Sequence, residues 1–284
     1  MVTLDAIRGP VAQELEEFDA FVRRNFKVEN ELLSGMVDYI LSSRGKGVRP
    51  LLVLLSAALN APAGGRGIGQ RTYLAAMLVE IIHTASLIHD DVIDEADTRR
   101  GRASANAKWQ SRNAVVLGDY LLARNMELGM RSGQYDLVSY VIASIATLCE
   151  GELLQSDRAE RMEITRDAYL EIIYKKTASL LGISAGVGAL SAGANREQVA
   201  RMRRFGDALG MAFQIQDDIL DFTRGAETGK PSNNDLREHK ITLPLLLLDR
   251  ADAARRDELL ALLARCREDE AAVDALQQAV EEQG

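Results

Sequence analysis

The chain has 284 residues, 47% of them hydrophobic, which is enough for a sizeable core in one large domain or two small ones. Its low aromatic content (5%) and five prolines favour helices over strands. The net charge of -8 argues against nucleic acid as the main partner. It also opposes an anionic substrate, unless bound cations and a local basic cluster offset it.

Apolar residues recur with helical periodicity, and no alternating strand pattern is present, so we expect an all-α chain. Helices or helical stripes are expected, in chain order, over residues 15–22, 36–41, 50–59, 71–96, 113–132, 135–154, 166–190, 196–223, 243–266 and 269–283. We expect a single domain over residues 1–284. The last helix is unfinished at Gly284, which leaves open an incomplete C-terminal part.

Three features of the sequence predict a cytoplasmic protein. The N-terminal residues lack the apolar run of a signal peptide. No window has the length and apolarity that we expect of a membrane span. Cys149 and Cys266 lie far apart without metal-ligand spacing, and we interpret them as buried or half-buried thiols in a reducing compartment.

Two aspartate clusters carry the functional signal. Asp90 and Asp94 lie four residues apart late in the longest predicted helix, so they share one face. Like charges at that spacing repel, but a hard divalent cation such as magnesium would turn the repulsion into a binding site. Asp217 and Asp221 repeat the spacing on another long helix. Because apolar residues precede both clusters, we favour a cavity mouth over a solvated acidic face.

Basic residues near these clusters supply the charge that a diphosphate needs. Each alone is most often a surface charge, but together they suggest sites for two diphosphates, and arginine offers bidentate phosphate recognition. They are Lys46, Arg49, Arg99, Arg100, Arg102, Lys175, Lys176, Lys230 and Lys240.

The motifs, in order, resemble those of trans-prenyl (polyprenyl) diphosphate synthases. The first aspartate-rich motif runs from Leu87 to Asp94 and is followed by Arg99, Arg100 and Gly101; the second runs from Phe213 to Asp221. The segments 45–50, 176–177, 229–231 and 240–244 also match, so the resemblance covers about residues 40–245. Arg44 and Gly47 depart from the family pattern, and His239 puts the position of Lys240 in doubt.

The resemblance implies the all-α isoprenoid synthase fold, a helical bundle around a deep central cavity, usually as a homodimer. It implies condensation of isopentenyl diphosphate with an allylic diphosphate, in which the two acidic clusters face each other with Mg²⁺ between them. The implied metal residues are Asp90, Asp94 and Asp217, with Asp91, Asp218 and Asp221 close by. The implied ligands are Lys46, Arg49, His83 and Arg100 for isopentenyl diphosphate, and Arg99, Lys176, Lys230 and Lys240 for the allylic diphosphate. Thr177 and Gln214 would face the reacting carbons. The alternative for His83 is an ordinary helix histidine, but it lies two turns before Asp90 on the same face.

The resemblance also implies that product length depends on residues four or five positions before Asp90, which lie roughly 6–7 Å deeper along the helix. These are Ser86 and Ala85. By the resemblance, bulky aromatic residues here stop the growing chain, so two small residues favour a long product of the kind used for quinone side chains. Alternatively, Ala85 only packs the helix, and Val79 or other deeper residues set the length.

Four alternatives stay open at this stage. A short-chain farnesyl or geranylgeranyl synthase is the nearest. A subunit of a heteromeric synthase is another, although partner subunits without activity tend to lose the acidic clusters. A terpene cyclase would not need the second complete cluster or the Lys46/Arg49 site. A generic helical scaffold would not explain carboxylates and cations within apolar helices.

Overall fold

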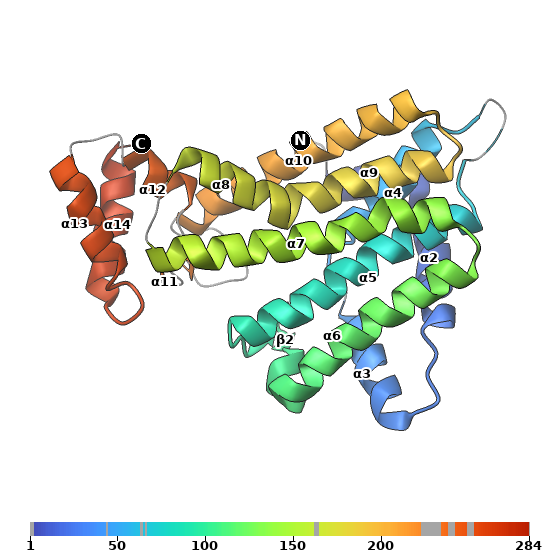
Figure 1. The fold of residues 1–284 in the computed structure, drawn as a ribbon, viewed down its shortest axis with the longest axis horizontal. Helices are drawn as coiled ribbons and strands as arrows, with labels where there is room; N and C mark the ends of the chain where they lie inside the picture. The colour runs from blue at the N-terminus through green and yellow to red at the C-terminus, as the bar shows by residue number, and fades with distance from the viewer. Residues whose placement is uncertain are drawn as a thin grey trace. The chain divides into compact units, whose positions relative to one another are not determined.

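The computed structural model describes residues 3–43, 45–62, 65, 67–161, 165–222, 234–237, 242–248 and 253–283. Arg44, Lys230, His239 and Lys240 therefore lie outside the described residues. The described part is built from helices and one two-stranded hairpin, which confirms the all-α fold class (Figure 1). The chain forms two compact units, Met1–Ile145 with Leu180–Gly206 and Ala146–Ser179 with Asp207–Gly284. The single domain expected from the sequence stays a prediction.

The elements fall into three groups. The first unit contains α1 (Leu4–Arg8), a 3-10 turn (Gly9–Val11), α2 (Ala12–Asn25), α3 (Glu31–Ser42), α4 (Val48–Leu59), α5 (Gln70–Ile93), β1 (Thr98–Arg99), β2 (Arg102–Ala103) and α6 (Ala105–Arg131). The second contains α8 (Arg166–Ile173), a π-helix (Tyr174–Ala178), α11 (Asn234–Arg237), α12 (Leu243–Leu248), α13 (Ala253–Leu263) and α14 (Glu270–Gln283). Residues of both units contribute to α7 (Tyr135–Arg161), α9 (Ser179–Ser191) and α10 (Arg196–Phe222).

Helix α5 is the centre of the first unit. It packs against α4 and lies side by side with α6 (Figure 1). Every residue from Thr72 to Ile82 is buried, which explains why this part of the helix is apolar apart from Thr72 and Glu80. The buried Asn125 side chain of α6 donates to the carbonyl of Leu78 at 2.9 Å. Its amide nitrogen is therefore hydrogen-bonded although it lies between two closely packed helices.

The core of the second unit lies at the end of α10. Phe222 packs in one buried cluster with residues of α11 to α14, among them Leu236, Leu245 and Leu276. Gln277 donates its side-chain amide to the Phe222 carbonyl at 3.0 Å, which satisfies a carbonyl that the helix end would otherwise leave unpaired.

Several element boundaries differ from the expectation. Residues 166–190, predicted as one helix, are two α-helices joined by the π-helix Tyr174–Ala178. Helix α6 begins at Ala105, where the Ser104 hydroxyl accepts from the Ala107 amide at 2.9 Å as an N-cap. Its backbone is not helical at Gln110 (φ 69°, ψ 154°), and the helix predicted over 113–132 lies after this break. The two-residue strands of the hairpin were not predicted, because strands this short carry no periodicity.

The expectation that no segment has the length and apolarity of a membrane span was wrong. Both α5 and α7 are long and apolar enough by length and composition. In α5 the apolar window is 72% buried, which identifies it as a core helix, whereas in α7 only 28% is buried. Cys149 is also exposed rather than buried, while Cys266 is buried and free.

Candidate active site

One face of α5 carries four polar side chains of increasing exposure. Glu80, His83, Asp90 and Asp94 follow each other at spacings of three, seven and four residues, which keeps them on one side of a helix. Glu80 is buried, His83 and Asp90 are half-buried, and Asp94 is exposed. The predicted Asp90/Asp94 pair is confirmed as neighbours, because Asp94 caps the helix and its amide donates to the Asp90 carbonyl at 2.8 Å.

Asp91, the next residue after Asp90, is buried and has a protein partner. It is 3% exposed, and its Oδ1 accepts from Arg99 Nε at 2.8 Å. A buried carboxylate that accepts from a guanidinium is stabilised by a charge-assisted hydrogen bond, and breaking such a pair leaves a buried charge uncompensated. Asp91 therefore ties the segment after α5 back onto the helix that carries Asp90.

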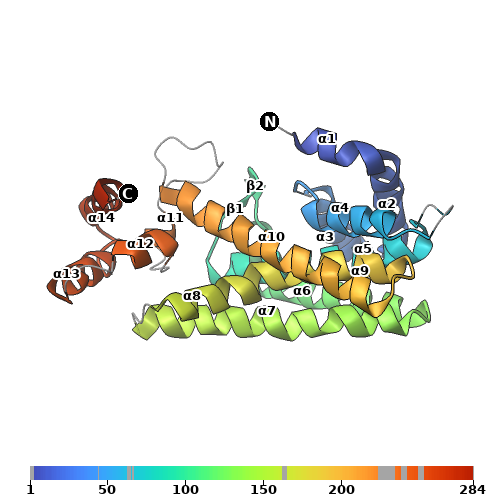
Figure 2. The same ribbon diagram turned by 90° about the horizontal axis from the view of Figure 1, so that it is seen from above.

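The segment after α5 turns sharply at Arg100 and Gly101. Both have positive φ, 55° and 72°, and they connect β1 to β2 in a hairpin that projects from the end of α5 (Figure 2). Two central residues with positive φ are typical of a tight hairpin turn, but arginine is an unusual choice for one of them. A strained non-glycine backbone held by its surroundings is a feature of functional sites.

The hairpin is fastened to the end of α3. Arg100 Nη1 donates to the Ser43 carbonyl at 2.8 Å, Arg102 Nη1 donates to the Ser43 hydroxyl at 2.6 Å, and the Tyr39 hydroxyl donates to the Ala103 carbonyl at 2.9 Å. The Arg102 guanidinium also lies 4.2 Å from the centre of the Tyr39 ring. These contacts hold Arg99 and Arg100 beside the segment that carries Lys46.

The Arg100 guanidinium lies directly on Gly45. A Cβ placed on Gly45 would lie 2.6 Å from Arg100 Cζ, so only glycine leaves room for this contact. Two residues later, Gly47 (φ 60°) precedes the first turn of α4, where Arg49 lies. The exposed Lys46 is held through its backbone, because its carbonyl accepts from Arg8.

Burial and mutual repulsion shape the electrostatics of this basic cluster. Burial lowers the pKa of Arg49 to about 10, Glu80 opposes that shift, and Arg100 adds to it. Burial also lowers the pKa of Arg100, again against Glu80. Arg49 therefore stays charged at neutral pH, and its buried Nε has no hydrogen-bond partner among the described residues. An unpaired buried donor on a charged group is what an incoming anion would satisfy.

In the second unit, the π-helix carries Lys176 and Thr177. It packs closely because glycines of two helices face it: a Cβ on Gly151 of α7 would lie 2.8 Å from Lys175 Cβ, and one on Gly210 of α10 would lie 2.4 Å from Ala178 Cα. Single π-turns inserted between α-helices frequently mark functional sites. Lys176 Nζ donates to Gln155 of α7 at 3.0 Å and pairs with Glu152 at 2.5 Å.

In the second aspartate cluster, as in the first, the second aspartate is buried and the other two are half-buried or exposed. Asp217 is exposed and Asp221 half-buried, whereas Asp218 is 3% exposed. The Tyr169 hydroxyl donates to Asp218 Oδ2 at 2.7 Å, and Gln214 Nε2 donates to Asp218 Oδ1 at 2.8 Å. Burial raises the pKa of Asp218, and these two hydrogen bonds oppose the shift. Asp221 accepts from the backbone amide of Asp235 at 3.2 Å.

Comparison with known proteins decides the family. The model of the polyprenyl synthetase family matches residues 30–282. The chain belongs to the polyprenyl synthetase family. It is therefore a prenyltransferase, as the order of its motifs predicted.

Three of the similar proteins illustrate the range of the family. Component 2 of the heptaprenyl diphosphate synthase of Geobacillus stearothermophilus is 39% identical over 86% of this chain and 75% of its own length. The short chain isoprenyl diphosphate synthase of Methanothermobacter thermautotrophicus is 35% identical over 82% of this chain and 72% of its own. The solved decaprenyl diphosphate synthase of Rhodobacter capsulatus is 33% identical, with a TM-score of 0.88 over 99% of this chain and 86% of that one.

Polyprenyl synthetases are generally metal-dependent, and the acidic residues of this chain fit that role. Among the described residues, no three His, Cys, Asp or Glu side chains gather into a complete ion site. Magnesium, however, is usually bound through one or two carboxylates and substrate phosphates, with water in the remaining positions. The exposed or half-buried Asp90, Asp94 and Asp217 are oxygen ligands of that kind.

Each unit of this polyprenyl synthetase brings part of the predicted site together. In the first, Arg49, Arg99 and Arg100 lie close enough to His83 to lower its pKa. In the second, the Thr177 hydroxyl donates to Gln214 at 2.7 Å. Asp90 and Asp217 belong to different units, so the prediction that they face each other stays a prediction. The implied roles of Lys230 and Lys240 also stay predictions.

Two residues of the site were missed by the sequence analysis. Glu80 is a buried acid within an apolar run, three residues before His83 on the same face, and that spacing was available as a signal. Tyr169 had no such signal, because an aromatic residue in a helix usually indicates core packing and its partner Asp218 is 49 residues away.

The His83 side chain should make the polyprenyl synthetase sensitive to acid. Burial and the nearby arginines lower the pKa of His83 well below its usual value of about 6.5. The unfolded chain therefore binds a proton near pH 6 that the folded chain does not, so stability should fall as the pH drops below about 6.5. In urea unfolding at about pH 7.5 and 5.5, His83→Gln should show a smaller loss than the wild type. An equal loss in both would contradict this assignment.

Proposed function

We propose that this polyprenyl synthetase condenses isopentenyl diphosphate with an allylic diphosphate to give a long-chain all-trans polyprenyl diphosphate. The observation that carries the proposal is the small side chain at both Ala85 and Ser86, on the helix that bears Asp90. The long products named for two of the three similar proteins support it. Ala85 is fully buried and Ser86 half-buried, with its hydroxyl donating to the His83 carbonyl at 2.9 Å.

Asp90, Asp94 and Asp217 would hold Mg²⁺. Bound there, the ions would act as Lewis acids that stabilise the diphosphate leaving group. Lys46, Arg49 and Arg100 would bind the diphosphate of isopentenyl diphosphate, with the unpaired Arg49 Nε as one donor. His83, kept neutral by burial, would donate a hydrogen bond without adding charge. Arg99 and Lys176, with Lys230 and Lys240 outside the described residues, would bind the allylic diphosphate.

One assay tests the activity and its product. The purified chain is incubated with Mg²⁺, farnesyl diphosphate and labelled isopentenyl diphosphate, and the labelled products are separated by length. We expect products in the heptaprenyl to decaprenyl range and none without a divalent cation. Products that stop at geranylgeranyl length, or at farnesyl length when geranyl diphosphate is the starter, would favour the short-chain alternative. No product with any allylic starter, but activity after addition of a second subunit, would favour the heteromeric alternative.

Replacing Ala85 by phenylalanine should shorten the product. A phenyl group adds a bulky wall about one turn below Asp90, where the growing chain would pass. We expect the main product of Ala85→Phe to shift to a length of about four or five isoprene units, while the consumption of isopentenyl diphosphate in the first condensation is kept. The control is Ala123→Phe on an exposed position of α6. An unchanged product spectrum would mean that Ala85 only packs the helix.

Replacing Gly45 by alanine should weaken the binding of isopentenyl diphosphate. The new Cβ would lie 2.6 Å from Arg100 Cζ, so the guanidinium has to move away. Because the displaced group is the end of a flexible side chain, stability should change by less than about 1 kcal/mol. We expect KM for isopentenyl diphosphate to rise about tenfold and KM for the allylic substrate to stay the same. The opposite pattern would show that Arg100 serves the allylic site.

A homodimer is the assembly that the first unit supports. Val116 (60% exposed) and Met130 (52%) lie on α6, and Tyr135 (60%) and Ile142 (47%) lie at the start of α7. We propose that these exposed apolar side chains on two consecutive helices are covered by a second copy of the chain. Light scattering should give twice the chain mass of 31.1 kDa, and Val116→Glu should lower it toward that of the monomer. A monomeric wild type that gains activity with a second subunit would instead support a heteromer.

A further inference from the structure

A chain of hydrogen bonds links four side chains of the second unit. Tyr169 of α8 donates to Asp218 of α10 at 2.7 Å. Asp218 accepts at its other oxygen from Gln214 at 2.8 Å, and Gln214 accepts from Thr177 of the π-helix at 2.7 Å. Tyr169 and Asp218 are only 4% and 3% exposed, so water cannot readily replace either partner. Neither Tyr169 nor this linkage is part of the proposed metal or diphosphate binding.

The chemistry of the groups sets the direction of every bond in this chain. The Tyr169 hydroxyl is the donor of the first bond, because a carboxylate oxygen can only accept. The amide nitrogen of Gln214 can only donate, and it faces the acceptor Asp218. The amide oxygen is thereby turned to Thr177, where it can only accept. Thr177 must therefore be the donor of the last bond.

This direction determines what Thr177 can offer to a substrate. A hydroxyl has one hydrogen and two lone pairs, and the hydrogen of Thr177 is already used by Gln214. Toward any other group the hydroxyl presents only its lone pairs. The Thr177 hydroxyl is therefore a poor ligand for a diphosphate oxygen, because that oxygen needs a hydrogen-bond donor. It is well suited to lie beside an electron-poor carbon, because the negative end of a fixed dipole stabilises positive charge.

We propose that Tyr169 and Asp218 are positioning residues that hold Gln214 in one orientation and so turn the Thr177 lone pairs toward the allylic cation formed in the reaction. The inference rests on the proposed function, because only an ionising allylic substrate provides such a cation. It gives Asp218 a role different from that of Asp217: both oxygens of Asp218 are already used by the protein, whereas Asp217 is exposed.

A double-mutant cycle tests the proposal. Tyr169→Phe, Thr177→Val and the double variant are compared by steady-state kinetics, with the free energy of unfolding measured for each in urea. Tyr169→Phe should lower kcat about ten- to a hundredfold, as expected for a misplaced catalytic neighbour, and change both KM values less than about threefold. Because Tyr169 acts through Thr177, adding Tyr169→Phe to Thr177→Val should lower kcat no further. Thr177→Ser, which keeps the hydroxyl, should retain most of the activity.

The control for loss of a phenol hydroxyl is Tyr120→Phe, at a half-buried residue of α6. It should leave kcat at the wild-type value. A Tyr169→Phe variant with wild-type kcat, or one whose effect is equally large in the Thr177→Val background, would overturn the proposal. The unfolding data separate a loss of folded enzyme from a loss of positioning, because kcat is taken per folded molecule.

The metal dependence of the aspartate variants separates positioning from metal binding. In Asp218→Asn, kcat should fall while the Mg²⁺ concentration for half-maximal activity stays within about twofold of the wild type. In Asp217→Asn that concentration should rise at least about tenfold. A comparable rise in Asp218→Asn would make Asp218 a metal ligand and overturn the inference. Absence of any prenyl transfer by the wild type in the same assay would overturn the proposed function itself, and the inference with it.

Discussion

Asp90→Asn is expected to lower kcat at least about a thousandfold, the largest effect that we predict for a single side chain. Asp90 is half-buried at the last turn of α5, one turn before Asp94. At the proposed metal site a neutral amide oxygen would be a much weaker ligand for a divalent cation, and the bound Lewis acid would contribute several kcal/mol to stabilising the leaving group. The kcat of both proteins is taken per folded molecule, with the folded fraction measured by urea unfolding.

A matched control for Asp90→Asn is Glu95→Gln. Glu95 is exposed and follows Asp94 directly, so it removes the same charge from the same end of α5. Its kcat should stay within about threefold of the wild type, because the long-range field of a single exposed charge is largely screened at ordinary ionic strength. Equal losses in the two variants would mean that the reaction needs the total negative charge at this end of α5 and not a metal ligand at position 90.

Gly210→Ala should damage both stability and activity, although glycine to alanine in a helix normally stabilises by about 1 kcal/mol. The new Cβ would lie 2.4 Å from Ala178 Cα, and this atom cannot rotate away because it belongs to the backbone of the π-helix. To reach ordinary contact, the two helices have to separate by about 1 Å. Such overpacking costs typically about 1–3 kcal/mol. The same displacement moves Thr177 and should lower kcat about a hundredfold.

Gly35→Ala is the natural comparison for Gly210→Ala. Gly35 lies exposed in the interior of α3, and a Cβ there would meet nothing within 4 Å. This variant should be about 0.5–1 kcal/mol more stable than the wild type in urea unfolding and equally active. If Gly210→Ala were stabilising too, the close approach of α10 and the π-helix would not be a property of the molecule in solution.

The sequence predicted the helical class and the aspartate pairs because both follow from a period of 3.6 residues. Asp90 and Asp94 are one turn apart in any α-helix, and the structure confirms it. The different environment of Asp91 was not predictable in this way. It depends on Arg99 folding back from a hairpin whose turn places Arg100 at φ 55°, a conformation that arginine rarely adopts. Local propensity contains no information about such a tertiary contact.

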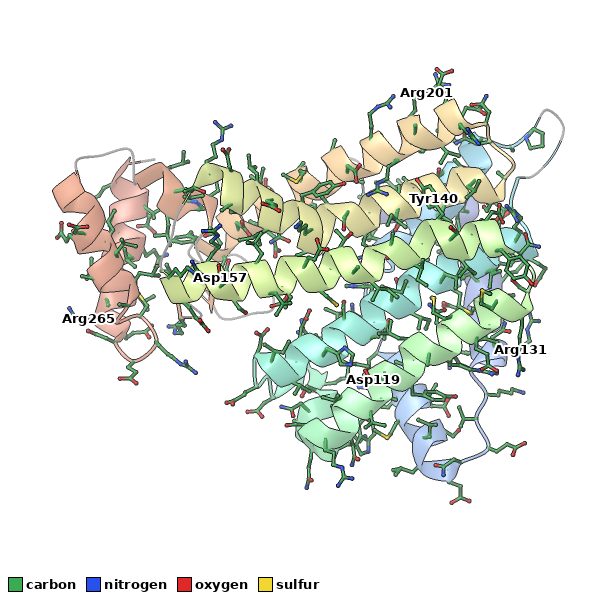
Figure 3. All side chains as sticks on the ribbon, in the orientation of Figure 1. Asp119, Arg131, Tyr140, Asp157, Arg201 and Arg265 are labelled. Atoms are coloured by element: carbon green, nitrogen blue, oxygen red, sulfur yellow. The ribbon has the colours of Figure 1, made fainter. Side chains whose placement is uncertain are left out.

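The partners of the cationic side chains could not be predicted from the sequence either. The sequence located Lys176 as a basic residue in a helix, but its pairing with Glu152 and Gln155 joins segments more than twenty residues apart. On the surface of α6, Asp119 lies 3.4 Å from the ring of His89, the neighbour of Asp90 (Figure 3). Charge and spacing in the sequence thus indicate which region a charged residue belongs to. They do not predict its ion-pair partner, because that depends on how the other helices pack.

The π-helix at Tyr174–Ala178 has a consequence for how the gene can vary in length. Each residue of an α-helix advances its direction by about 100°, so one inserted or deleted residue before Ser179 would rotate Lys176 or Thr177 away from α10, or shift the phase of all that follows. The single widened turn absorbs such an offset between α8 and α9. Insertions and deletions should therefore be rare between Tyr169 and Ser179.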